Sequence, residues 1–100
     1  MNIPDSIKIA GHTISVEKVS AMDCTSPGEY NNFMQRIQLR EDSQSPQDQQ
    51  DEAFLHEIIE AIKALNNLEI DHTHLTVLSE NLYQIMTCNS LSWVQEADNE

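Results

Sequence analysis

Residues 54–62 read FLHEIIEAI, and this stretch decides the predicted fold. Apolar side chains recur in it, and just beyond it, at intervals that place them on one side of an α-helix turning about 100° per residue. They are Phe54, Leu55, Ile58, Ile59, Ile62 and Leu65. We predict a helix from about residue 46 to residue 66, with Ser45 as N-cap, Pro46 in the first turn and Asn66 at the end.

A second apolar pattern follows the break at Asn66-Asn67 and predicts another helix over about residues 73–88. The side chains expected to face the core are Leu75, Leu78, Leu82 and Ile85. Residues 91–100 are mostly polar or acidic, and we predict that they form an acidic C-terminal tail.

Before the first helix the pattern changes from helical spacing to alternation, which is typical of strands with one buried face. The alternating residues are Ile7, Ile9, Ile14 and Val16. They predict a β-hairpin with Ala10-Gly11-His12 as its turn and an exposed His12. Pro27-Gly28 fits the centre of a type II turn, because glycine accepts the positive φ required there. FMQRIQLR, residues 33–40, predicts a further strand.

Together these elements predict an α+β fold for residues 1–90. We expect a small antiparallel sheet of about three strands, between about residues 6 and 40, packed with the two main helices. A chain of 100 residues has room for one domain. Its 39% hydrophobic content is enough for a thin core.

The composition limits the partners and the location. The net charge of -12 argues against direct binding to nucleic acid or to an anionic membrane, since both need a cationic surface. Solubility alone would explain such a charge, and a partner with a basic groove would also suit it. The sequence shows no transmembrane run and no secretory signal, so we expect a cytoplasmic protein. Cys24 and Cys88, far apart in sequence, are expected to be free thiols.

His56, Glu57 and Glu60 form an H-E-x-x-E motif on the predicted first helix. Residues four apart on a helix project side by side, about 5–6 Å apart, which suits two ligands of one zinc ion. Glu57 would then stand beside the ion as a general base. His72 is the preferred third ligand and His74 the alternative. An ordinary solvated helix face, with Glu60 near Lys63, explains the same residues without a metal.

The order of several segments resembles that of small phage and prophage proteins with a metallopeptidase-like, minimal zincin domain. The segments are IPDSIKIAGHT (3–13), GEY (28–30), MQRIQL (34–39), FLHEIIEAI (54–62) and LSENLYQIM (78–86). The resemblance implies a reduced zincin core with zinc at the first helix, His56 as its first ligand and Glu57 as the base. Glu60 stands where the fuller H-E-x-x-H pattern has histidine. This departure affects the expected peptidase activity more than the expected metal binding.

Three functions follow from these observations. The first is a zincin-like metal-binding protein of the bacterial host cytoplasm, a degenerate or highly specialised metal-dependent hydrolase, in which metal binding is expected rather than retained cleavage of a peptide substrate. The second is a non-enzymatic acidic accessory protein of a phage that binds and inhibits a host or defence protein, as a nucleic-acid mimic would. The third is a purely structural zinc site that helps a thin core to fold. An exposed strand edge would also allow a homodimer.

Overall fold

Four strands are followed by two helices, which confirms the predicted α+β class. The computed structural model describes residues 3–20, 26–41 and 46–89. The elements are β1 (Ser6–Ile9), β2 (His12–Val19), β3 (Gly28–Asn31), β4 (Arg36–Arg40), α1 (Gln47–Leu65) and α2 (His72–Cys88). The predicted tail, residues 91–100, lies outside the described residues, as do Ser45 and Cys24, whereas Cys88 is a free, exposed thiol.

The strands form one mixed sheet in the order β1-β2-β4-β3. β1 pairs with β2 and β3 with β4 in antiparallel fashion, while β2 and β4 run parallel. The sheet therefore has one strand more than the three expected, and one parallel pair. The apolar pattern does not predict the extra strand, β3, because its four residues, GEYN, contain one large apolar side chain, Tyr30, which is only partly buried.

The two glycines of the sheet serve different purposes. Gly11 and Ala10 have φ values of 81° and 51°, so they form the two-residue hairpin turn between Ile9 and His12. The predicted type II turn at Pro27-Gly28 is wrong, because Gly28 opens β3 and has no positive φ. A Cβ at Gly28 would lie 3.0 Å from Cγ of Glu57, so the glycine is needed where α1 approaches β3.

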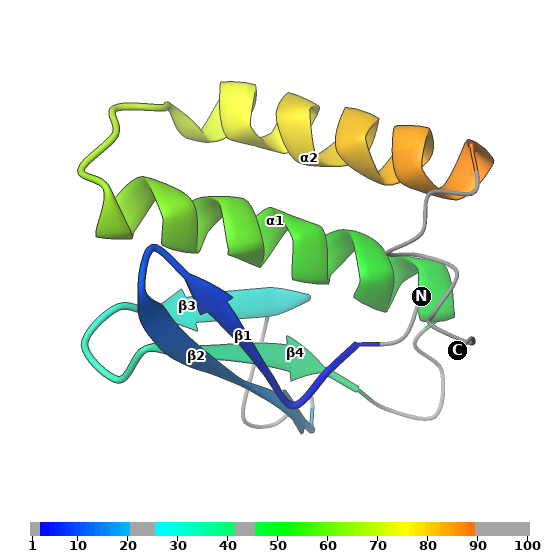
Figure 1. The fold of residues 1–100 in the computed structure, drawn as a ribbon. Coiled ribbons are helices and arrows are strands. Elements are labelled where there is room, and N and C mark those ends of the chain that lie inside the picture. The colour runs from blue at the N-terminus through cyan, green and yellow to red at the C-terminus, as the bar shows by residue number, and fades with distance from the viewer. Residues whose placement is uncertain (1–2, 21–25, 42–45, 90–100) are drawn as a thin grey trace.

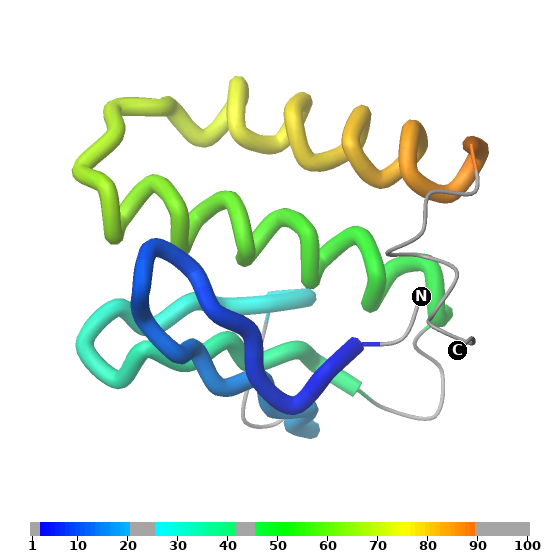
Figure 2. The backbone as a smooth tube through the Cα atoms, in the orientation of Figure 1, coloured from blue at the N-terminus to red at the C-terminus, as the bar shows by residue number. Residues whose placement is uncertain are grey.

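The elements stack in three layers: the sheet, then α1, then α2 (Figure 1). Both helices lie on the same side of the sheet, and among the described elements α2 contacts only α1. The two helices run in opposite directions, joined by a short connection at one end (Figure 2). The largest fully buried apolar side chains are Phe54, Ile14, Ile37, Leu39 and Leu75. All but Leu75 belong to the core between α1 and the sheet.

The first helix matches its predicted range closely. It spans Gln47–Leu65, with Pro46 and Asn66 as its caps. The predicted N-cap Ser45 and the place of Pro46 in the first turn are wrong, because the backbone of Pro46 is extended and the helix begins after it. The Pro46 cap has no side-chain hydrogen bond. Phe54, Leu55 and Ile59 of the predicted stripe are buried, and the other three side chains pack against the core. The apolar side chains of α1 face two neighbouring layers, because α1 lies between the sheet and α2.

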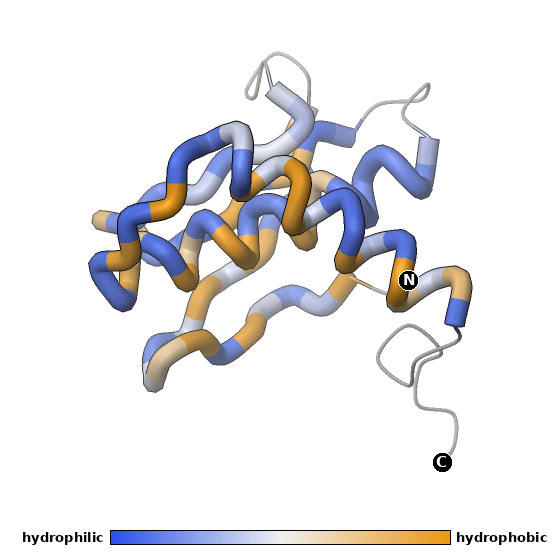
Figure 3. The backbone as a smooth tube through the Cα atoms, turned by 90° about the horizontal axis from the view of Figure 1, so that it is seen from above, coloured by the Kyte–Doolittle hydropathy of each residue, from blue (hydrophilic) through white to orange (hydrophobic). Residues whose placement is uncertain are grey.

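The predicted stripe of the second helix is wrong except for Leu75. Leu78, Leu82 and Ile85 are 48%, 39% and 50% exposed, and the buried side chains are instead Leu75, Ser79 and Met86. The reason is that α2 has one neighbouring element, α1, which covers only a narrow face. Hydrophobic and hydrophilic residues alternate along both helices (Figure 3). Neither α1 nor α2 has both the length and the apolar character needed to cross a membrane.

Candidate metal centre

His56, Glu60 and His72 come together from the two helices. Oε2 of Glu60 lies 3.6 Å from Nε2 of His56 and 3.8 Å from Nδ1 of His72. The two imidazole rings meet edge to face, with their centroids 5.4 Å apart. One ligand atom from each residue falls within 4.8 Å of the others, so the group could hold a metal ion.

The packing of α1 explains why this group forms. One face of α1 covers the sheet and a second contacts α2, which leaves a third face bordering the space between α2 and β3. His56, Glu57 and Glu60 lie on that third face, and all three line the same groove. His72 reaches them because it is the first residue of α2, next to the connection between the helices. Asp71 caps α2 by accepting a hydrogen bond from the backbone N–H of His74.

The other histidines are placed elsewhere. Nδ1 of His74 lies 3.0 Å from Oδ2 of Asp71, and His74 does not belong to the metal-ligand group found in the described residues. The structure thus brings in His72, the preferred third residue, rather than His74. His12 is exposed at the hairpin, as predicted, and bonds with Nε2 of Gln35.

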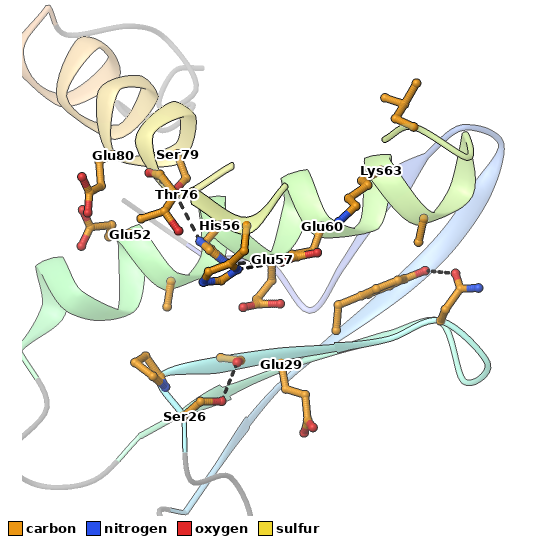
Figure 4. A pocket seen from close by; sticks show the side chains of 18 of the residues that line it. Ser26, Glu29, Glu52, His56, Glu57, Glu60, Lys63, Thr76, Ser79 and Glu80 are labelled. Carbon is orange, nitrogen blue, oxygen red and sulfur yellow. Dashed lines mark hydrogen bonds and ion pairs between the residues drawn. The ribbon is translucent and has the colours of Figure 1, made fainter. Parts of the chain in front are cut away.

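Glu57 occupies a different environment from Glu60. Its side chain points from α1 toward β3 (Figure 4), and the residue is only 7% exposed. Burial first, and then the negative charges of Glu60 and Glu29, raise the pKa of Glu57, whereas a hydrogen bond from the Tyr30 backbone lowers it; the net value is about 7. At neutral pH this carboxyl group is therefore near the midpoint of its titration.

The groove around these residues has a volume of about 1230 Å³. It runs between the helices and β3, which is an edge strand of the sheet. Its acidic lining residues are Glu29, Glu52, Glu57, Glu60, Glu69 and Glu80. Lys63 is the one lysine or arginine among the described lining residues. The groove is therefore strongly acidic, and it is open enough to admit an extended chain.

Two residues at this site were missed in the sequence. Ser79 of α2 is fully buried beside His56, and Gly28 of β3 leaves room for Glu57. Ser79 lies four residues after Leu75, a spacing that puts both on the α1-facing side of α2. That spacing was a usable signal, but the apolar pattern favoured Leu78 and Leu82 instead.

Comparison with models of known protein families, with curated proteins and with solved structures gives no match to this chain. The resemblance to small phage and prophage proteins with a metallopeptidase-like domain therefore stays a prediction. The function has to be argued from the site itself.

Proposed function

We propose that the chain is a zincin-like protein of the bacterial cytoplasm that binds one zinc ion through His56, Glu60 and His72. The observation that carries this proposal is the convergence of these side chains from two helices. Four ligands around a tetrahedral zinc ion, at roughly 2.1 Å each, lie roughly 3.4 Å from one another. The separations of 3.6 and 3.8 Å from Glu60 are close to that requirement. Two imidazoles and one carboxylate are also a ligand set that catalytic zinc uses.

The proposed activity is hydrolysis of a peptide. When bound, zinc supplies a Lewis acid that polarises a carbonyl group and lowers the pKa of water. Glu57 is placed to act as general base, because it lines the groove next to the ligands. A carboxylate in that place can accept a proton and return it. The β3 edge supports a peptide as substrate, since an edge strand can pair with an extended chain.

Metal content tests the proposal directly. Tag-free protein is analysed for elements and by native mass spectrometry, with His56→Ala and His74→Ala in parallel. We expect one equivalent of zinc in the wild type and in His74→Ala, and none in His56→Ala. His74→Ala is the matched control, because it removes the same type of side chain at a position outside the group. Zinc-free wild type, or full zinc content in His56→Ala, would contradict the proposal.

The base role needs a separate test. Glu57→Gln should keep its zinc, because the substitution changes no proposed ligand, and should lose hydrolysis of a fluorogenic peptide library. If that variant hydrolyses peptides at the wild-type rate, Glu57 is not the base.

A second candidate function is a non-enzymatic protein that binds and inhibits a basic host or defence protein. The observation that favours it is the acidic lining of the groove, together with the net charge of -12. Such binding would weaken with salt, and it would not depend on the protonation of Glu57.

A lysine- and arginine-rich peptide tests this candidate by fluorescence anisotropy at low and high salt. Binding that is lost in the double variant Glu52→Gln and Glu80→Gln, and retained in Glu57→Gln, would favour the second function. Both glutamates lie beside each other on the two helices, and neither belongs to the proposed ligand group (Figure 4). If the basic peptide binds no more tightly than an uncharged peptide of equal length, the second function is excluded.

A further inference from the structure

Ser79 is a buried polar residue beside the candidate metal centre. It is only 1% exposed, and it lies on the face of α2 that meets α1. Its Oγ lies 3.5 Å from Nδ1 of His56 and 3.0 Å from the backbone oxygen of Thr76 (Figure 4). The ring nitrogen on the other side of His56, Nε2, faces Glu60.

Counting hydrogens determines the direction of these contacts. A serine hydroxyl has one hydrogen and two lone pairs, and a backbone carbonyl oxygen can only accept. The shorter contact with Thr76 therefore uses the hydroxyl hydrogen. Toward His56 the same oxygen can then only accept, and a hydrogen bond at this 3.5 Å contact requires the ring hydrogen on Nδ1. In the neutral ring this leaves the lone pair on Nε2.

We propose that Ser79 is a positioning residue that holds His56 in the tautomer with hydrogen on Nδ1, so that Nε2 is the metal-binding nitrogen. This inference rests on the proposed zinc site and adds the group that prepares its first ligand. Histidine ligands commonly donate their other ring N–H to a neighbouring acceptor, which fixes both the tautomer and the ring orientation. Ser79 is the acceptor that the helix contact provides.

Ser79 could instead be only a small side chain that lets the helices approach, and Ser79→Ala separates the two roles. Alanine keeps the small size and favours helix, so the variant should fold. It removes the hydroxyl, which is the acceptor for His56 and the donor to the backbone oxygen of Thr76. Thr87→Val is the matched control, because it removes a hydroxyl from the same helix. That hydroxyl donates to the backbone oxygen of Tyr83, and no histidine is among its hydrogen-bond partners in the described residues.

The ring nitrogens of His56 are observed by NMR in metal-free protein labelled with ¹⁵N, at one pH where the ring is neutral. We expect the Nδ1–H tautomer in the wild type and in Thr87→Val, and a shift toward the Nε2–H tautomer in Ser79→Ala. A wild type with hydrogen on Nε2, or a tautomer unchanged in Ser79→Ala, would overturn the inference. A role in packing alone would not change this signature.

Zinc affinity gives the second measurement. Loss of such an acceptor typically weakens metal binding about 10- to 100-fold, so we expect that change in Ser79→Ala and none in Thr87→Val. Equal affinity in all three proteins would overturn the positioning role. The two proposals can fail separately, because the tautomer is read without metal. A wild type that binds no zinc overturns the proposed function, and the NMR result alone then decides what Ser79 does to His56.

Discussion

The two helices are similar in length, 19 and 17 residues, but they are held in different ways. α1 lies between the sheet and α2, so apolar side chains are buried on two of its faces. Among the described elements α2 contacts only α1, and Leu78, Leu82 and Ile85 are 48%, 39% and 50% exposed. An apolar pattern thus shows which side chains could be buried, whereas the number of neighbouring elements decides which are. The candidate metal centre joins the firmly packed helix to the less covered one.

The largest expected effect tests the packing difference itself. Phe54 of α1 is fully buried in the core between α1 and the sheet, so Phe54→Ala should lower the free energy of unfolding by about 3–5 kcal/mol. Leu82→Ala on α2 should lower it by about 1 kcal/mol, since Leu82 is 39% exposed and loses less apolar burial. Urea unfolding of both variants measures the difference. Similar losses in the two would mean that the outer face of α2 is covered in solution.

Zinc should reduce the difference in local stability between α1 and α2. Ligand at about 100 times its dissociation constant stabilises a folded protein by about 2.7 kcal/mol. Because His72 starts α2, the added protection should appear in the amide hydrogen exchange of residues 72–88 more than in that of β4. His72→Ala should remove this protection, while His74→Ala should keep it. Exchange in α2 that is unchanged by zinc would contradict the proposed link between the helices.

Gly28 offers a test of the contact between α1 and β3. A methyl group there would lie 3.0 Å from Cγ of Glu57 and 3.2 Å from Cδ2 of Leu39. We expect Gly28→Ala to lower the free energy of unfolding by about 1–3 kcal/mol, as overpacking does. The control is Gly28→Ala in a Glu57→Ala background, where shortening the neighbour should recover part of the loss. Full stability of the single variant would show that α1 and β3 are not in close contact.

The smallest expected effect concerns the protonation of Glu57. In the folded chain its pKa is about 7, above the ordinary value of 4.5, so the folded state holds more protons than the unfolded state between these values. Stability should therefore fall as the pH rises through that window. In Glu57→Gln this loss is absent, so the variant should be more stable than the wild type at about pH 8 and close to it near pH 4.5.

Thermal unfolding in the presence of a chelator measures this difference, because a bound cation would change the charge balance around Glu57. The same pH slope in wild type and variant would mean that Glu57 ionises normally in the folded chain.

Local periodicity predicted much of the fold. The spacing of Phe54, Ile58 and Ile62 located α1 to within a residue or two, and the alternation around Gly11 located the hairpin. β3 was missed because pairing with β4, rather than its own composition, makes GEYN a strand. For α2 the boundaries were close, but its buried face was wrong, because a single sequence does not show how many elements cover a helix.

The site was partly predictable for similar reasons. His56 and Glu60 share one helix, so their spacing alone places them together. The choice of His72 over His74 depended on the connection between the helices, and the structure brings in His72. The spacing of Ser79 from Leu75 indicated at most its side of the helix, and the roles of Ser79 and Gly28 come from contacts with residues 23 and 29 positions away in the chain.

X-ray diffraction from zinc-grown crystals, recorded at the zinc absorption edge, tests the central claim most directly. The account predicts one strong anomalous peak between α1 and α2, about 2.0–2.1 Å from Nε2 of His56 and Nδ1 of His72 and about 2.0–2.2 Å from a carboxylate oxygen of Glu60. No peak at these three residues, or an ion bound elsewhere, would contradict it.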